Sequence, residues 1–146
     1  MRIYGINEGY FEIPEEWSDR SVNVFSASGD LPGDFSLVIT RESLEDNQNF
    51  ESYVDEQLNA LSKTLSRFKL TGKYAASVDR APALNAEFTW ETEGKRMVQR
   101  QVYVKCNRQA LVFTATTVER FSQEYWQTID NILTTFRMSR FGFADR

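Results

Sequence analysis

The chain has 146 residues, of which 41% are hydrophobic and 14% aromatic. This is enough for one domain with its own core, without disulfides or a structural metal. Its 17 Lys and Arg residues are outnumbered by 21 Asp and Glu residues, so the charge favours neither nucleic acid nor an anionic membrane surface as a partner. We therefore expect residues 1–146 to form a single domain, and we set both classes of partner aside.

Catalytic chemistry is not expected from this composition. The chain has no histidine and a single cysteine, Cys106, which excludes an internal disulfide, a histidine triad and the usual zinc sites. Its carboxylates follow no motif, and Gly29 and Gly33 are spaced for a turn, with no GKS or GKT after them. Lys105 is placed to lower the pKa of Cys106, but an isolated cysteine in a strand is more often a packing residue. We predict a protein without enzymatic activity, cofactor or metal.

The N-terminus does not have the pattern of a targeting signal. Met1 and Arg2 are followed by alternating apolar and small residues, with no apolar run of the roughly 7 to 15 residues that a signal peptide needs. Nowhere does an apolar stretch approach the ~20 residues that span a bilayer. We expect a cytoplasmic protein that does not insert into a membrane itself.

The first elements in chain order are two short strands. Residues 3–6 and 10–13 flank a turn at 7–9, which predicts a hairpin at an edge of the sheet. Pro14 then interrupts the hydrogen-bonded ladder, because proline has no N–H to donate. Trp17 is expected to cap the rim of the core.

The next two strands are expected at residues 21–26 and 35–40, on either side of a loop at 27–34 that is rich in Gly, Pro and Asp. Neither strand has a strongly polar face. One side of the second strand carries Phe35, Leu37 and Ile39. The opposite side, together with one side of the first strand, carries Val22, Val24, Ser36, Val38 and Thr40. Such strands need cover on both faces, and we expect one cover to be at least partly an apolar surface of another molecule.

Two stretches have the apolar spacing of amphipathic helices. The first runs over residues 50–66, with Asn47 or Asn49 as its N-cap. The second runs over 121–136 and begins near Ser122. Its apolar stripe is thick enough for a main core element, and consists of Phe121, Tyr125, Trp126, Ile129, Ile132, Leu133 and Phe136.

Four further strands are predicted, at 68–78, 84–90, 97–106 and 111–118. The third of these places Val98, Arg100, Val102 and Val104 on one face and Met97, Gln99, Gln101, Tyr103 and Lys105 on the other. The last is short of charge on both faces, and the tail at 138–146 is expected to be flexible. The fold class predicted is α+β, a mainly antiparallel twisted β-sheet of about six to eight strands with one inserted helix and one C-terminal helix.

Several spaced blocks of the chain resemble one known family. They are Glu12-Ile13-Pro14 with Trp17, residues 21–25 and 35–41, the first helix with Tyr53-Val54 and Gln57-Leu58, Phe68-Lys69-Leu70, and Arg100-Gln101-Val102-Tyr103. In this order they resemble the Eag chaperones that accompany type VI secretion effectors, which belong to the DcrB-related group with a PsbP-like fold. The resemblance extends over nearly the whole chain, from residue 1 to about 136.

The resemblance implies a cytoplasmic, homodimeric chaperone that holds the N-terminal transmembrane helices of a secreted toxin until the toxin is loaded for export. It places the client-helix-binding surface on Val22, Val24, Ser36, Val38, Thr40, Gln57 and Gln101. Leu61 and Tyr103 are added from helix and strand spacing only. From the pattern alone the strand residues are equally typical of core beneath a helix, and Gln57 of a solvated helix face. The alternative function is a protein-binding or lipid-binding module with another partner.

The chemistry of these residue types agrees with that implication. Each large apolar side chain of an exposed membrane helix is worth about 1.5 to 3 kcal/mol when buried, and the valines offer it cover. Ser36 and Thr40 are small enough for a helix to approach closely, while Gln57 and Gln101 can donate hydrogen bonds. Six strands at ~4.8 Å span ~29 Å, about the length of a membrane helix, so one protomer covers one side of a helix. Enclosure then needs a second copy.

Overall fold

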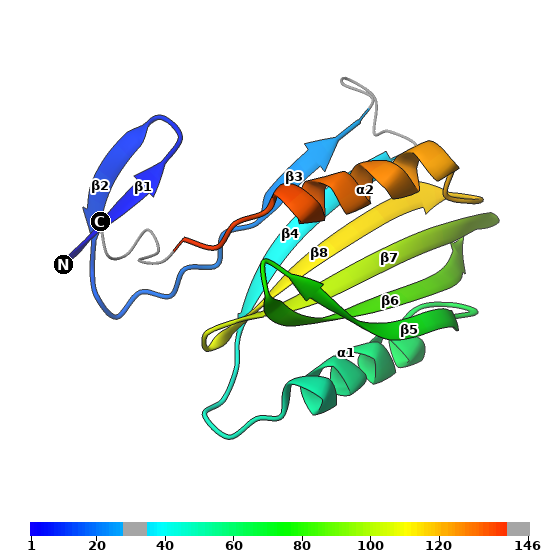
Figure 1. Ribbon diagram of the computed structural model, residues 1–146, viewed down its shortest axis with the longest axis horizontal. Coiled ribbons are helices and arrows are strands. Elements are labelled where there is room, and N and C mark those ends of the chain that lie inside the picture. Colours follow the sequence, from blue (N-terminus) through cyan, green and yellow to red (C-terminus); the bar gives the residue numbers. More distant parts are fainter. Residues whose placement is uncertain (28–34, 140–146) are drawn as a thin grey trace.

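The computed structural model describes residues 1–27 and 35–139, which form a hairpin, a six-stranded antiparallel sheet and two helices (Figure 1). The hairpin consists of β1 (Arg2–Ile6) and β2 (Gly9–Ile13). The sheet has the order β3-β4-β8-β7-β6-β5. Its strands are β3 (Asn23–Ser26), β4 (Phe35–Ser43), β5 (Lys69–Val78), β6 (Ala81–Thr92), β7 (Lys95–Cys106) and β8 (Gln109–Val118). With α1 (Phe50–Thr64) between β4 and β5 and α2 (Gln123–Thr135) after β8, the predicted α+β fold is confirmed.

Both helices begin where the sequence supplies an N-cap. The Asn49 side chain accepts a hydrogen bond from the backbone N–H of Ser52 at 3.0 Å, and Ser122 accepts one from the N–H of Tyr125 at 3.1 Å. Each bond satisfies a backbone donor that a helix start leaves unpaired. Of the two N-caps considered for the first helix, Asn49 is the one used. In the described part of the chain, neither helix is long and apolar enough to cross a membrane.

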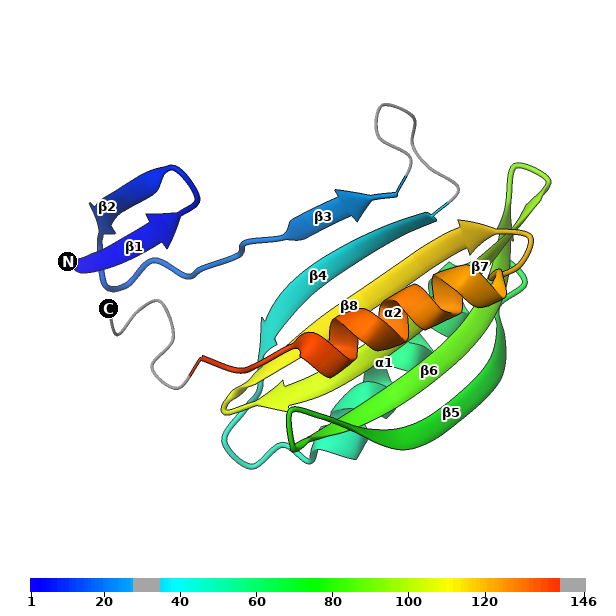
Figure 2. The same ribbon diagram turned by 45° about the horizontal axis from the view of Figure 1, so that its top comes forward.

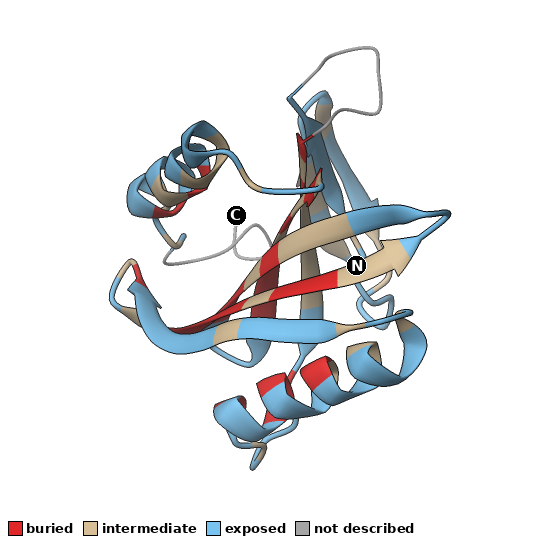
Figure 3. Cartoon of the chain, turned by 90° about the vertical axis from the view of Figure 1, so that its right-hand side faces the viewer, coloured by how far each residue is buried: buried red, intermediate tan, exposed pale blue. Residues whose placement is uncertain are grey.

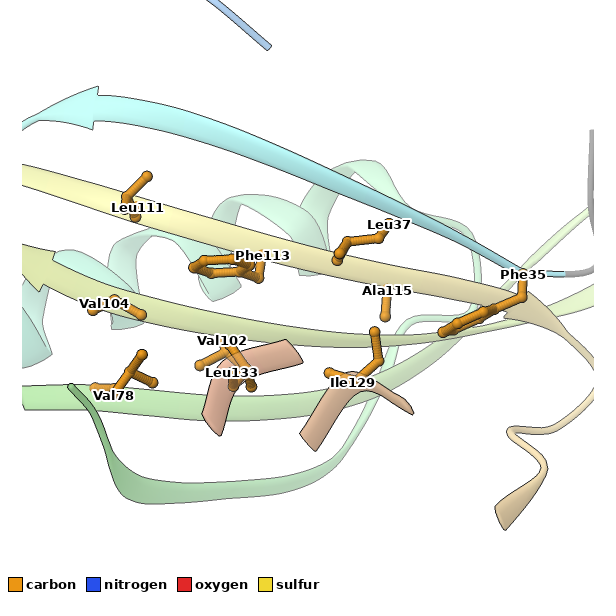
Figure 4. Packing of buried hydrophobic residues seen from close by; sticks show 11 residues of the cluster. Phe35, Leu37, Val78, Val102, Val104, Leu111, Phe113, Ala115, Ile129 and Leu133 are labelled. Atoms are coloured by element: carbon orange, nitrogen blue, oxygen red, sulfur yellow. The ribbon is translucent and has the colours of Figure 1, made fainter. Parts of the chain in front are cut away.

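The two helices lie on opposite faces of the sheet (Figures 1 and 2). On one face, Ile129 and Leu133 of α2 pack against Phe35, Leu37, Ala83, Val102, Val104, Leu111, Phe113 and Ala115 (Figure 4). On the other face, Tyr53, Val54 and Leu58 of α1 pack against Leu84, Ala86, Phe88, Tyr103, Ala110 and Val112. Figure 3 shows that the buried residues of both helices lie on their sheet-facing sides. Strand alternation thus divides the interior into two cores, one on each side of the sheet.

One buried charge lies within the α2 side of the sheet. Arg100 follows the alternation predicted for β7 and is only 6% exposed. Its Nε donates to Asn85 Oδ1 at 2.7 Å, its Nη2 donates to Asp130 Oδ1 at 2.8 Å, and its guanidinium lies 4.1 Å from the centre of the Trp126 ring. These directional contacts join β6, β7 and α2, and they favour a single strand register.

The prediction that the hairpin forms an edge of the sheet is wrong. β1 and β2 pair only with each other in the described chain, as a separate two-stranded sheet. Pro14 ends the ladder, and the residues after it lead away from the hairpin before β3 begins (Figure 1). The strand expected at 21–26 is also shorter, because its pairing with β4 begins at Asn23.

Two expectations about core residues are wrong as well. Trp17 does not cap the core, since it is 62% exposed and lies in the connection between β2 and β3. Ile132, assigned to the core stripe of the second helix, lies on its more exposed side at 36%. A helix turns by about 100° per residue, so the next residue, Leu133, points to the sheet instead.

Two expected segments lie wholly or partly outside the described residues. The loop expected at 27–34 overlaps the undescribed residues 28–34, and the tail expected at 138–146 overlaps the undescribed residues 140–146. The first residue of that tail is held in place. The N–H of Met138 donates to Asp79 Oδ2 at 2.8 Å, and Met138 packs against the core beneath α2.

Candidate functional site

α1 leaves much of its own face of the sheet uncovered. Its apolar contacts are with β6, β7 and the first half of β8, and near its start Tyr53 contacts Glu42 at the end of β4 while Asp55 pairs with Lys73 of β5. Within the described chain, no helix covers β3, the rest of β4 and the second half of β8 on that side (Figure 1). We call this surface the open face. Its residues are Val24, Ser26, Ser36, Val38, Thr40, Thr114, Thr116 and Val118. All are half-buried or exposed, and Val24 reaches 66% exposure.

Strand pairing aligns the open face into rows that cross the sheet. The first row is Val24, Val38, Thr114 and Gln101. The second is Ser26, Ser36, Thr116 and Gln99, and the third is Thr40, Val112 and Tyr103. Neighbouring rows are two residues apart along each strand, about 6.6 Å. The predicted residues of β3 and β4 therefore lie on the same side of the sheet as those of β7, which is distant in the sequence.

The valines of this surface lie at its outer margin. Val22 directly precedes β3 and is 53% exposed. Val24 pairs with Val38, so the two side chains are neighbours on the same side of β3 and β4. Apolar side chains exposed in a row at a sheet edge form a surface suited to an apolar partner.

Gln101 lies at the boundary between the open face and α1. Its Nε2 donates to Thr114 Oγ1 at 3.2 Å, and its Oε1 accepts a hydrogen bond from the Tyr103 hydroxyl. Tyr103 is only 2% exposed, with its ring edge-on to that of Tyr53. Burial, together with the Glu42 carboxylate, raises the pKa of Tyr103, so its hydroxyl stays protonated and can donate. Tyr103 thus contacts the open face through Gln101 and not directly.

α1 runs along the strands and forms a wall of the open face. Near its start Tyr53 donates to Glu42 of β4 at 2.7 Å, and just past its end the Ser66 carbonyl accepts a backbone hydrogen bond from β6 at 2.9 Å. Gln57 and Leu61 follow Tyr53 at intervals of four residues, and therefore lie on the same side of α1. Both are half-buried, and Leu61 also packs against the core beneath α1.

Three polar residues of this region were not predicted as site residues: Gln99, Thr114 and Thr116. Gln99 Nε2 donates to Thr116 Oγ1 at 2.9 Å, and Trp90 Nε1 donates to Gln99 Oε1 at 2.6 Å. The sequence did indicate that Thr114 and Thr116 lie on a surface without charge, because the strand predicted at 111–118 is short of charge on both faces. It did not indicate which strands lie beside that strand.

The open face offers apolar area and hydrogen bonds without charge. On the α1 side of β3, β4, β7 and β8, among the described residues, the charged side chains are Glu42, Lys95 and Lys105. Glu42 and Lys105 lie opposite Ala110 at one end of these strands, and Lys95 lies at the other end, where β7 begins and pairs with Thr92 of β6. Burial of a charged ligand against uncharged side chains costs free energy. The arrangement therefore suits an uncharged, mainly apolar partner.

Cys106 does not have the surroundings of a reactive thiol. It is half-buried against the core beneath α2. Burial raises its pKa, which is the opposite of the lowering considered for a neighbouring Lys105. A thiol with a raised pKa is a poorer nucleophile near neutral pH, so Cys106 is a packing residue.

The chain matches a known family. Residues 8–135 match the model of the DcrB family, and the chain belongs to that family. It is 31% identical over 118 residues to Effector EagT6 of Pseudomonas aeruginosa. The aligned region covers 80% of this chain and 82% of that protein. The resemblance to Eag-type, DcrB-related proteins is therefore confirmed.

Solved structures share the fold. The crystal structure of PA94, a protein of unknown function from Pseudomonas aeruginosa, has a TM-score of 0.82 with 27% identity, over 94% of this chain and 96% of that one. LpqN, involved in cell envelope biogenesis of Mycobacterium tuberculosis, has a TM-score of 0.55 with 15% identity, over 86% of this chain and 79% of that one. The likeness to LpqN concerns the fold alone.

Proposed function

We propose that the protein is a chaperone that shields the N-terminal transmembrane helices of a type VI secretion effector in the cytoplasm before export. The observation that carries the proposal is the open face, an uncharged surface of valines and small hydroxyl residues beside α1. The relationship to Effector EagT6 supports the connection with an effector. The proposed client-helix-binding residues are Val22, Val24, Ser36, Val38, Thr40, Gln57, Leu61 and Gln101, with Tyr103 acting through Gln101.

The proposed client-helix-binding residues have three separate tasks. Val22, Val24 and Val38 bury apolar side chains of the client, and each large side chain buried is worth about 1.5 to 3 kcal/mol. Ser36 and Thr40 leave room for a helix backbone, as small residues do between membrane helices. Gln57 and Gln101 donate hydrogen bonds to polar groups of the client.

The proposed homodimer is supported by the hairpin. Two paired strands are marginally stable by themselves in water, and the hairpin is joined to the following segment through Tyr4, whose hydroxyl bonds Asp19 at 2.7 Å and Ser21 at 2.8 Å. Its apolar residues Ile3 and Ile6 are about half exposed, at 51% and 52%. A second copy of the chain that covers these residues also provides a second binding surface, so that the client helix is enclosed from two sides.

Light scattering on the purified chain is expected to give the mass of a dimer. A monomer at micromolar concentration contradicts the proposed homodimer.

The function is tested by co-expressing the chain with the N-terminal apolar region of the effector encoded beside it. Wild type is expected to keep that region soluble and to co-purify with it. The double variant Val22→Glu/Val38→Glu is expected to lose it, because two charges are then buried against an apolar helix. The matched control, Ser52→Glu/Asn59→Glu, adds the same charge on the exposed side of α1 and is expected to retain the client.

Circular dichroism and thermal unfolding establish that each variant is folded. If the folded Val22→Glu/Val38→Glu variant retains the client as well as wild type, the open face is not the binding surface. If wild type does not bind the region at all, the chaperone function is wrong. A protein-binding or lipid-binding module with another partner is then the better description.

A further inference from the structure

Two hydrogen-bonded triads stand side by side where the open face meets α1. The first triad is centred on Gln101 of the first row: the Tyr103 hydroxyl donates to Gln101, which donates to Thr114 at 3.2 Å. The second triad is centred on Gln99 of the second row: Trp90 donates to Gln99 at 2.6 Å, and Gln99 donates to Thr116 at 2.9 Å. The second triad repeats the chemistry of the first one row further along the strands.

The second triad has a fixed orientation. The indole N–H of Trp90 is only a donor, so the amide oxygen of Gln99 must face it and the amide nitrogen must face Thr116. One of the two amide hydrogens is used in this way, and among the described residues no bond is found for the other. Because Thr116 Oγ1 accepts, its own hydrogen is directed elsewhere. Gln99, Trp90 and Thr116 are each half-buried, so these two donors border the open face.

The dimensions of the sheet place a client helix over these rows. α1 lies along the strands above β6 and β7. Packed helices are about 8 to 10 Å apart, which is about two strand spacings of 4.8 Å. A helix lying against α1 is therefore centred above β8 and β4, with its axis along the strands. Its residues four apart are about 6.0 Å apart along that axis, close to the ~6.6 Å between the rows.

From this match we propose that Gln99, held by Trp90 and Thr116, is a second polar contact that selects client helices with two small or hydroxyl-bearing residues four positions apart. The inference rests on the proposed function. Gln101 with Thr114 contacts one of the two residues, and Gln99 with Thr116 contacts the other. A serine hydroxyl oxygen, or a backbone carbonyl left accessible by glycine or alanine, accepts the free hydrogen. A leucine at either position blocks the approach and leaves the donor unpaired.

The test uses three helices of 20 residues, each fused to the N-terminus of a soluble carrier and co-expressed with the full chain. All are leucine-rich. The first has serines at positions eight and twelve, the second has serines at eight and ten, and the third has one serine at eight. The first two have the same composition, but in the second the serines point to opposite sides of the helix. Competition for the purified chaperone gives the ratio of the affinities.

Wild type is expected to bind the first helix about three- to tenfold more tightly than the second or third, the effect of one hydrogen bond. Gln99→Met is expected to abolish the preference while still binding all three. Thr116→Val is a second variant that removes only the hydroxyl, and it is expected to weaken the preference. Gln109→Met changes an exposed glutamine at the start of β8 and is expected to leave the preference intact.

Each contrary result has a distinct meaning. If wild type binds the three helices equally and Val22→Glu/Val38→Glu abolishes binding, the proposed function stands and the selective role of Gln99 is wrong. The same holds if folded Gln99→Met retains the full preference. If wild type binds none of the helices, both the inference and the proposed function are overturned.

Discussion

β4 and β8 have two surfaces that differ in size, polarity and cover. Toward α2 they present Phe35, Leu37 and Phe113, which are buried. Toward α1 they present half-exposed residues of the open face such as Val38 and Thr114. The difference arises from the helices, since α2 lies over β4, β8 and β7 whereas α1 packs on β6, β7 and the first half of β8. One surface therefore stabilises the fold while the other is left available for a partner.

The largest expected effect compares two adjacent residues of β8 that face opposite sides. Phe113→Ala is expected to lower the free energy of unfolding by about 3 to 5 kcal/mol, because it leaves a cavity beneath α2. Thr114→Ala is expected to lower it by less than about 1 kcal/mol, because the side chain is half-exposed. Urea unfolding measures both. If the two variants lose equal free energy of unfolding, the open face also belongs to the core, and the distinction between the two surfaces of β8 is wrong.

A smaller effect is expected from the polar contacts on the α2 side. Arg100→Met removes the bonds to Asn85 and Asp130, and is expected to lower the free energy of unfolding by about 1 to 3 kcal/mol. The loss is moderate because Asp130 is 42% exposed and regains water. Lys105→Met, on the other face of β7, is the exposed control and is expected to change stability by less than about 0.5 kcal/mol. Urea unfolding that finds Arg100→Met as stable as the control contradicts a structural role for Arg100.

The smallest effect is a dependence on alkaline pH on the α1 side. Burial, and to a lesser extent Glu42, raises the pKa of Tyr103 in the folded chain above the value of about 10 in the unfolded chain. Above pH 10 only the unfolded state releases this proton, so the contribution of Tyr103 to stability is lost as the pH rises. The expected loss is about 1.4 kcal/mol per pH unit above 10.

The effect is isolated by comparing urea unfolding at pH 8 and pH 11 for wild type and Tyr103→Phe. Phenylalanine cannot ionise, so the variant is expected to lose less stability between the two pH values than wild type does. Other groups also titrate in this range, and the comparison with the variant cancels their contribution. An identical pH dependence in both proteins indicates that Tyr103 ionises as readily in the folded chain as in the unfolded one.

Much of the fold was predictable from local patterns. The alternation of residues 35–40 assigned each side chain to the correct face, because side chains in a strand alternate whatever the neighbouring strands are. The apolar spacing of both helices and the N-cap at Ser122 were predictable for the same reason, because they depend only on residues close together in the sequence. The hairpin was also expected, but its separation from the main sheet was not, since an isolated strand pair has the same pattern as an edge.

The sequence by itself determined the part of the open face that β3 and β4 provide: Val24, Ser36, Val38 and Thr40 on one side of two strands, with no charge among them. Only the tertiary structure decided that α1 leaves these residues uncovered and buries Tyr103. It also decided that β8 lies between β4 and β7, so that Thr116 meets Gln99. The physical reason is that the face of a side chain depends on the alternation of its own strand, whereas its neighbours depend on contacts between strands far apart in the sequence.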